Sequence, residues 1–127
     1  MIIVSNNPKV NENFENVKFI AGSYEDVLIE VKRLIIDDHL RLLTHPLSSS
    51  LKPNETYYRT IFLNETHFPE IDLESLEYME EAIEVYNKFI KSKQRPTWVA
   101  SVLADFATVD YFIAQSTFER IGYNFQK

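Results

Sequence analysis

Short runs rich in β-branched residues alternate with longer segments of helical periodicity, and this alternation points to the α/β class. The strands are expected at residues 2–4, 17–20, 40–43 and 57–63, and the helices at 8–14, 24–36, 72–91 and 97–120. Because strand–helix–strand connections favour parallel pairing with right-handed crossovers, we predict a small, mainly parallel sheet of about four strands flanked by helices. Two consecutive helices follow at the C-terminus, and residues 1–127 form a single domain.

Residues at the predicted helix ends support these boundaries. Asn7 is a favourable N-cap, and Pro8 fits the first helical position because it has no N–H to donate. Ser23 and Asp72 are expected to cap the second and third helices. Gly122 is expected to end the last helix.

Composition excludes several functions. The 127 residues carry a net charge of −6, which argues against nucleic acid as a partner. There is no cysteine, so thiol and disulfide chemistry is excluded, and with only two glycines the chain contains neither glycine-rich nucleotide-binding motif. No signal peptide or membrane span is expected, so we predict a cytoplasmic protein. No cofactor is expected, and no metal site, because the histidines and acids lack the spacing of a known one.

The segment Thr44–Arg59 is the most distinctive part of the chain. It contains two prolines between apolar runs and is expected to be a loop that follows the third strand. If the first and third strands are neighbours, this loop meets residues Asn6–Pro8 at the carboxyl edge of the sheet, where ligands bind in parallel α/β folds. The predicted ligand-binding residues are Asn6, Asn7, His45, Ser48, Ser49, Ser50, Lys52, Asn54, Thr56 and Arg59. Amides, hydroxyls and two cationic groups suit a small anionic ligand, a carboxylate or a phosphate.

A catalytic function also stays open. His45 is the candidate catalytic residue of a small enzyme, acting as general acid or base with Ser48 or Lys52 assisting. The alternative for such a loop is purely structural, because serine, proline and asparagine often satisfy their own backbone.

Aromatic side chains near the C-terminus suggest a structural interaction module. Most aromatic residues of the chain lie at or after Tyr57. Trp98, Tyr111 and Phe118 could form a contact surface for a partner or for a second copy in a homo-oligomer. The simpler alternative is that these side chains complete the core.

Several motifs resemble the GrdX family. They are the opening Ile2-Ile3-Val4-Ser5-Asn6-Asn7-Pro8, the Thr44-His45-Pro46-Leu47-Ser48 and Lys52-Pro53-Asn54-Glu55-Thr56 segments, and the acidic helix that begins at Asp72. The resemblance follows the whole length in order. The sequence departs from the family pattern at Ser49 and Tyr57, where a glycine and a proline are usual, and this makes the loop bulkier.

The resemblance implies an accessory role in a reductase system and no known activity. GrdX proteins are small proteins encoded beside the glycine, sarcosine and betaine reductase components of anaerobes that ferment amino acids. Reductase components are therefore the expected partners. Those reductases use selenol and thiol chemistry, which a chain without cysteine cannot relay.

Overall fold

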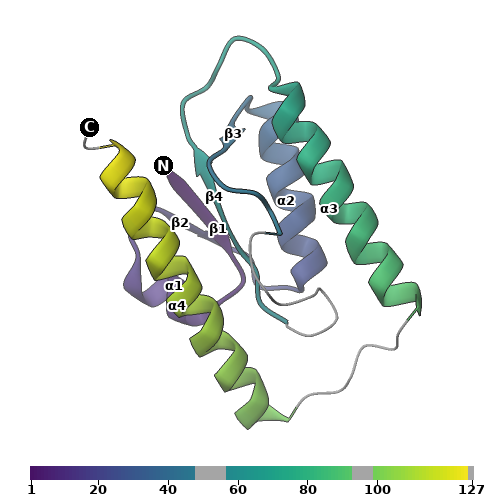
Figure 1. Ribbon diagram of the computed structural model, residues 1–127, viewed down its shortest axis with the longest axis vertical. Helices are drawn as coiled ribbons and strands as arrows, with labels where there is room; N and C mark the ends of the chain where they lie inside the picture. The colour runs from purple at the N-terminus through teal and green to yellow at the C-terminus, as the bar shows by residue number, and fades with distance from the viewer. Residues whose placement is uncertain (48–56, 93–98, 126–127) are drawn as a thin grey trace.

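The protein is a three-layer α/β sandwich with a four-stranded sheet in the middle (Figure 1). The computed structural model describes residues 1–47, 57–92 and 99–125. The strands are β1 (Ile2–Ser5), β2 (Val17–Phe19), β3 (Arg41–Leu42) and β4 (Thr60–Asn64), in the order β2-β1-β4-β3. The helices are α1 (Pro8–Asn13), α2 (Tyr24–Asp37), α3 (Leu73–Ser92) and α4 (Ala100–Phe125). The predicted α/β class is confirmed.

The sheet is mixed, so the prediction of a mainly parallel sheet is wrong. β1 and β2 are parallel, whereas β4 is antiparallel to both of its neighbours, β1 and β3. Hence β4, not β3, lies beside β1. The reason lies in the connections: α1 joins β1 to β2 as a crossover, but no helix occurs in the described part of the segment between β3 and β4. The carboxyl ends of β1 and β3 still point to the same edge, because both strands are antiparallel to β4.

The two faces of the sheet pack against different pairs of helices, because side chains alternate between the faces along each strand. Val4, Ile61 and Leu63 pack on α2 and α3, whereas Ile3 and Phe62 pack on α1 and α4. Figure 1 shows the α2–α3 pair on one side of the sheet and the α1–α4 pair on the other. Each face therefore has its own apolar core.

The helix starts follow the predicted caps more closely than the ends do. Ser23 and Asp26 form a capping box at the start of α2, and Asn7 caps α1. The predicted stop at Gly122 is wrong, because α4 continues to Phe125 and Gly122 does not have positive φ. Within the three described ranges, no helix is long and apolar enough to cross a membrane.

Candidate functional site

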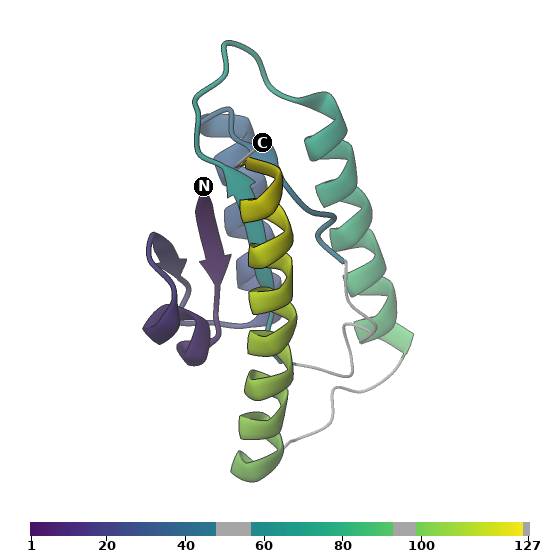
Figure 2. The same ribbon diagram turned by 60° about the vertical axis from the view of Figure 1, so that its left-hand side comes forward.

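Polar side chains are buried together where β1 ends and β4 begins. We call this group the buried polar cluster: Ser5, Asn6, Asn7, Arg59, Thr60 and Asp110. Ser5 pairs with Thr60 in the β1–β4 ladder, so the end of one strand lies beside the start of the other. α4 runs along one face of the sheet (Figure 2), and its residue Asp110 accepts hydrogen bonds from Asn7 and Thr60. Three chain segments that are distant in sequence thus converge at one edge of the sheet.

Asn6 connects the loop after β1 to two other loops. Its Nδ2 donates to the carbonyl oxygens of Gly22 and Tyr57, at 3.1 and 3.0 Å. Its Oδ1 accepts from the backbone N–H of Arg59 at 2.8 Å. The predicted meeting of the loop after β1 with the segment before β4 is therefore present, but through an amide that protein groups already occupy.

Asn7 performs two structural tasks with one amide. Its Oδ1 accepts from the Lys9 N–H and caps the six-residue helix α1. Its Nδ2 donates to the Ala107 carbonyl at 2.8 Å and to Asp110 Oδ2 at 2.9 Å, which ties α1 to α4. Both atoms of the amide have protein partners, so Asn7 shapes the site and presents no free donor to a ligand.

A directed chain of hydrogen bonds ends on Asp110. Thr60 Oγ1 donates to Asp110 Oδ2 at 2.7 Å, so its single proton is used there, and Ser5 Oγ must be the donor in its 2.8 Å contact with Thr60. The N–H of Asn7 in turn donates to Ser5 Oγ at 3.0 Å. Burial raises the pKa of Asp110, while hydrogen bonds from Asn7 and Thr60 and the charge of Arg59 lower it in part.

Arg59 is a buried cation beside a buried hydroxyl. Its side chain is 4% exposed and Tyr24 is 0% exposed. Among the described residues, neither Arg59 Nε nor the Tyr24 hydroxyl has a hydrogen-bond partner of good geometry. Burial raises the pKa of Tyr24, and the nearby Arg59 charge partly opposes this effect. Arg59 lowers the Tyr24 pKa both by its charge and by hydrogen bonding, so the two side chains lie next to each other, in a contact whose hydrogen-bond geometry is poor.

A small cavity adjoins Arg59. It is lined by Thr44 beyond β3, by Arg59 and Thr60, and by the α4 residues Asp110 and Thr117, among others. Its volume is about 10 Å³, close to the space that one water needs. A larger group can enter only if the surrounding side chains move apart.

The other predicted site residues are divided between a separate surface and an undescribed segment. His45 is exposed, its Nδ1 accepts from the Leu47 N–H at 3.0 Å, and its ring lies 5.1 Å from that of Tyr78. These contacts connect His45 to α3 rather than to Asn6 or Asn7. Six predicted ligand-binding residues lie outside the described residues: Ser48, Ser49, Ser50, Lys52, Asn54 and Thr56.

The sequence interpretation missed Ser5, Tyr24, Thr60 and Asp110. For Asp110 a signal was present in the pattern of α4. The buried side chains of this helix recur at three- or four-residue intervals: Ala107, Asp110, Ala114, Thr117 and Ile121. An acid in a stripe of small and apolar residues is a candidate buried carboxylate. In the described part of the chain, no group of three or more histidines and acids is placed to hold a metal ion.

The comparisons with known proteins agree with the motifs at this edge of the sheet. A comparison with curated proteins and one with solved structures each find no match. The family model described as GrdX-like protein matches residues 2–119, which include both β1 with its Asn-Asn-Pro turn and most of α4. The chain therefore belongs to the GrdX-like family.

Proposed function

We propose that this GrdX-like protein is an accessory protein of an amino-acid reductase system that binds a small anionic ligand or a reductase component. The binding region would comprise Thr44–Arg59 together with Asn6–Pro8, where the Asn6 and Asn7 amides hold the surrounding segments in place. The accessory role rests on the family resemblance, since GrdX proteins are encoded beside reductase components. The proposal that the ligand is an anion rests on the side chains of Arg59 and Tyr24.

The buried guanidinium of Arg59 carries the anion proposal. It has no ion-pair partner among the described residues. A buried charge is costly unless it is paired and hydrogen-bonded. Asp110 feels the Arg59 charge, but its Oδ2 already accepts from Asn7 and Thr60 and burial favours its neutral form. A carboxylate or phosphate would supply the missing partner.

Tyr24 adds a second donor of the right kind. Its hydroxyl is buried, forms no hydrogen bond of good geometry with a described residue, and lies beside Arg59, whose charge and hydrogen bonding lower its pKa. A guanidinium together with a hydroxyl is a typical donor set for an oxyanion. Because the adjoining cavity is so small, we expect binding to be accompanied by a local opening around Arg59.

Isothermal titration calorimetry with acetate and, separately, phosphate tests this site. Arg59→Met should abolish measurable binding while leaving the thermal midpoint unchanged or raised, since a buried unpaired charge is removed. Tyr24→Phe should weaken binding by about three- to tenfold through loss of one hydrogen bond. Ser48→Ala and Lys52→Ala test the undescribed part of the segment in the same titration.

Arg33→Met is the matched control, because it makes the same substitution at an arginine on α2 whose side chain is 44% exposed. It should bind both anions as the wild type does. Wild-type affinity in Arg59→Met would show that Arg59 is not the anion site. Binding that falls equally in Arg33→Met would show only a general effect of net charge.

The exposed face of α4 favours a second role as a contact module for a partner protein. Val109 and Phe112 are 43% and 59% exposed on this helix. Tyr111 instead packs on Phe14, with ring centroids 5.9 Å apart, and Trp98 lies outside the described residues. Phe112→Ser should weaken association with a purified reductase component without changing anion affinity. Unchanged association would argue against this surface.

A further inference from the structure

A second, larger hollow lies at the opposite end of β1. It is a groove of about 580 Å³ between the chain after α1, the start of β1 and the later turns of α4. Figures 1 and 2 place the start of β1 and the C-terminal turns of α4 at the same end of the molecule. The volume is in the range of small-molecule sites. None of its lining residues belongs to the buried polar cluster.

One wall of the groove is aromatic. Phe14, Tyr111 and Phe118 all line it. The Phe14 ring lies 5.9 Å from that of Tyr111 and 5.3 Å from that of Phe118, and both ring pairs are inclined by 60°. Phe118 remains 39% exposed. Aromatic faces that solvent can reach attract organic cations through the ring quadrupole.

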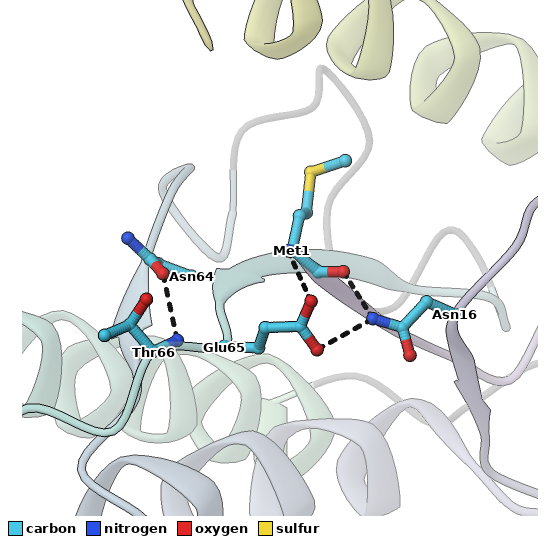
Figure 3. A network of polar contacts seen from close by, with 5 residues as sticks. All are labelled: Met1, Asn16, Asn64, Glu65 and Thr66. Atoms are coloured by element: carbon cyan, nitrogen blue, oxygen red, sulfur yellow. Dashed lines mark hydrogen bonds and ion pairs between the residues drawn. The ribbon is translucent and has the colours of Figure 1, made fainter.

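The rest of the lining combines three acidic residues with three amide residues, Asn13, Asn16 and Gln115, and with Met1, whose ammonium group is the one cation on the described wall. Glu15, Glu65 and Glu119 line the groove, and no lysine or arginine is among the described residues that do so. Glu65 binds the Met1 ammonium group at 2.9 Å and accepts from Asn16 Nδ2 at 2.9 Å, as Figure 3 shows. These contacts lower the pKa of Glu65, so it stays ionised. Glu15 and Glu119 form no ion pair with another described residue.

We infer that this groove binds an alkylammonium group, with the Phe14, Tyr111 and Phe118 rings against its alkyl carbons and Glu15 and Glu119 opposite its charge. An aromatic wall with carboxylates beside it matches both parts of such a ligand. The Met1 ammonium on Glu65 is an example of the ammonium–carboxylate half of this contact within the same groove. The inference is independent of the proposed anion site, which lies at the other end of β1 and has the opposite charge preference.

An NMR titration with tetramethylammonium chloride, at ionic strength held constant with sodium chloride, tests the groove. The ring resonances of Phe14, Tyr111 and Phe118 should shift and saturate. Phe118→Leu should raise the dissociation constant by about three- to fivefold. The double variant Glu15→Gln with Glu119→Gln should raise it at least as much, and both acids are exposed, so the fold should be kept.

Glu77→Gln is the matched control, because it removes one exposed carboxylate from α3, away from the groove. It should leave the dissociation constant unchanged. The inference is wrong if the rings do not shift, if uncharged tert-butanol or magnesium produces the same shifts, or if the double glutamate variant binds as tightly as the wild type. Acetate titration of the same samples reports on the Arg59 site separately.

Discussion

The two ends of β1 contain similar polar contacts in opposite surroundings. At the carboxyl end, Ser5 and Asn7 are fully buried and their hydrogen bonds span 2.8 to 3.0 Å. At the amino end, Met1, Asn16 and Glu65 make the contacts drawn in Figure 3, which span 2.6 to 2.9 Å. The Glu65 side chain, however, is 52% exposed. Distance alone therefore does not rank these contacts. What differs is the cost of losing one, because water replaces a partner only at the exposed end.

Asn7→Ala, at the buried end of β1, should lower the stability of the protein more than any other variant considered below. The variant removes the α1 cap, the Asn7 hydrogen bond to the Ala107 carbonyl and one of the two donors to Asp110 Oδ2. We expect the free energy of unfolding to fall by about 2–4 kcal/mol in urea titrations. Asn13→Ala is the control on the same helix, because Asn13 is exposed and, among the described residues, its side chain donates to the Lys9 carbonyl alone. Equal losses in the two variants would remove the distinction between buried and exposed amides.

Thr60→Val should have an intermediate effect. Valine keeps the shape of threonine, but Asp110 loses a donor and Ser5 loses its acceptor. The expected loss is about 1–2 kcal/mol by urea unfolding. Thr60→Ser retains the hydroxyl and should recover most of this stability. If serine and valine are equally destabilising, the cause is packing rather than the hydrogen-bond chain.

Asp110→Asn should change the pH dependence of stability more than stability itself at neutral pH. The amide oxygen can still accept from Asn7 and Thr60. Because the pKa of Asp110 is raised in the folded state, the folded protein binds the proton more tightly than the unfolded chain. The wild type should therefore lose stability relative to Asp110→Asn as pH rises above about 4, the ordinary aspartate pKa.

The measurement for Asp110 is the difference in unfolding free energy between the two proteins at each pH. Taking the difference cancels Glu30 and Glu65, whose lowered pKa values give the opposite slope. A difference that stays constant with pH would show that Asp110 has an ordinary pKa.

Glu65→Gln, at the exposed end of β1, should have the smallest effect on stability. The carboxylate is exposed, and exposed ion pairs add little to stability because solvent screens them. We expect no measurable change in the urea midpoint. A loss as large as that of Thr60→Val would mean that the amino end of β1 is as tightly constrained as the carboxyl end.

Local patterns predicted the helices well, because their signals are local. The i, i+3, i+4 spacing and the Ser23 cap predicted α2 to within one residue of its observed end at Asp37. The predicted helix end at Gly122 was wrong because a helix can contain a glycine in its interior, at a modest cost in free energy. Nothing lies within 4 Å of a Cβ placed there, so the position is open and imposes no turn.

The sheet order and the buried acid could not be predicted in the same way. The segment between β3 and β4 is long enough to connect either parallel or antiparallel strands. The sequence therefore could not show that β4 is antiparallel to β1 and β3. Asn6 and Asn7 were identified as site residues, but their partners Gly22, Tyr57 and Asp110 lie far along the chain. Only the assembled fold reveals that these amides are occupied.

The bond between Asn7 and Asp110 joins residues 103 positions apart, and this has a consequence for synthesis on the ribosome. β1, β2 and β4 are all translated before α4, so the first part of the chain emerges without the carboxylate that Asn7 and Thr60 contact. The nascent sheet would expose Ile3 and Phe62 on the face that α4 later covers. Completion of this face must therefore wait until α4 has left the exit tunnel, and a chain stalled before that point would be a substrate for chaperones.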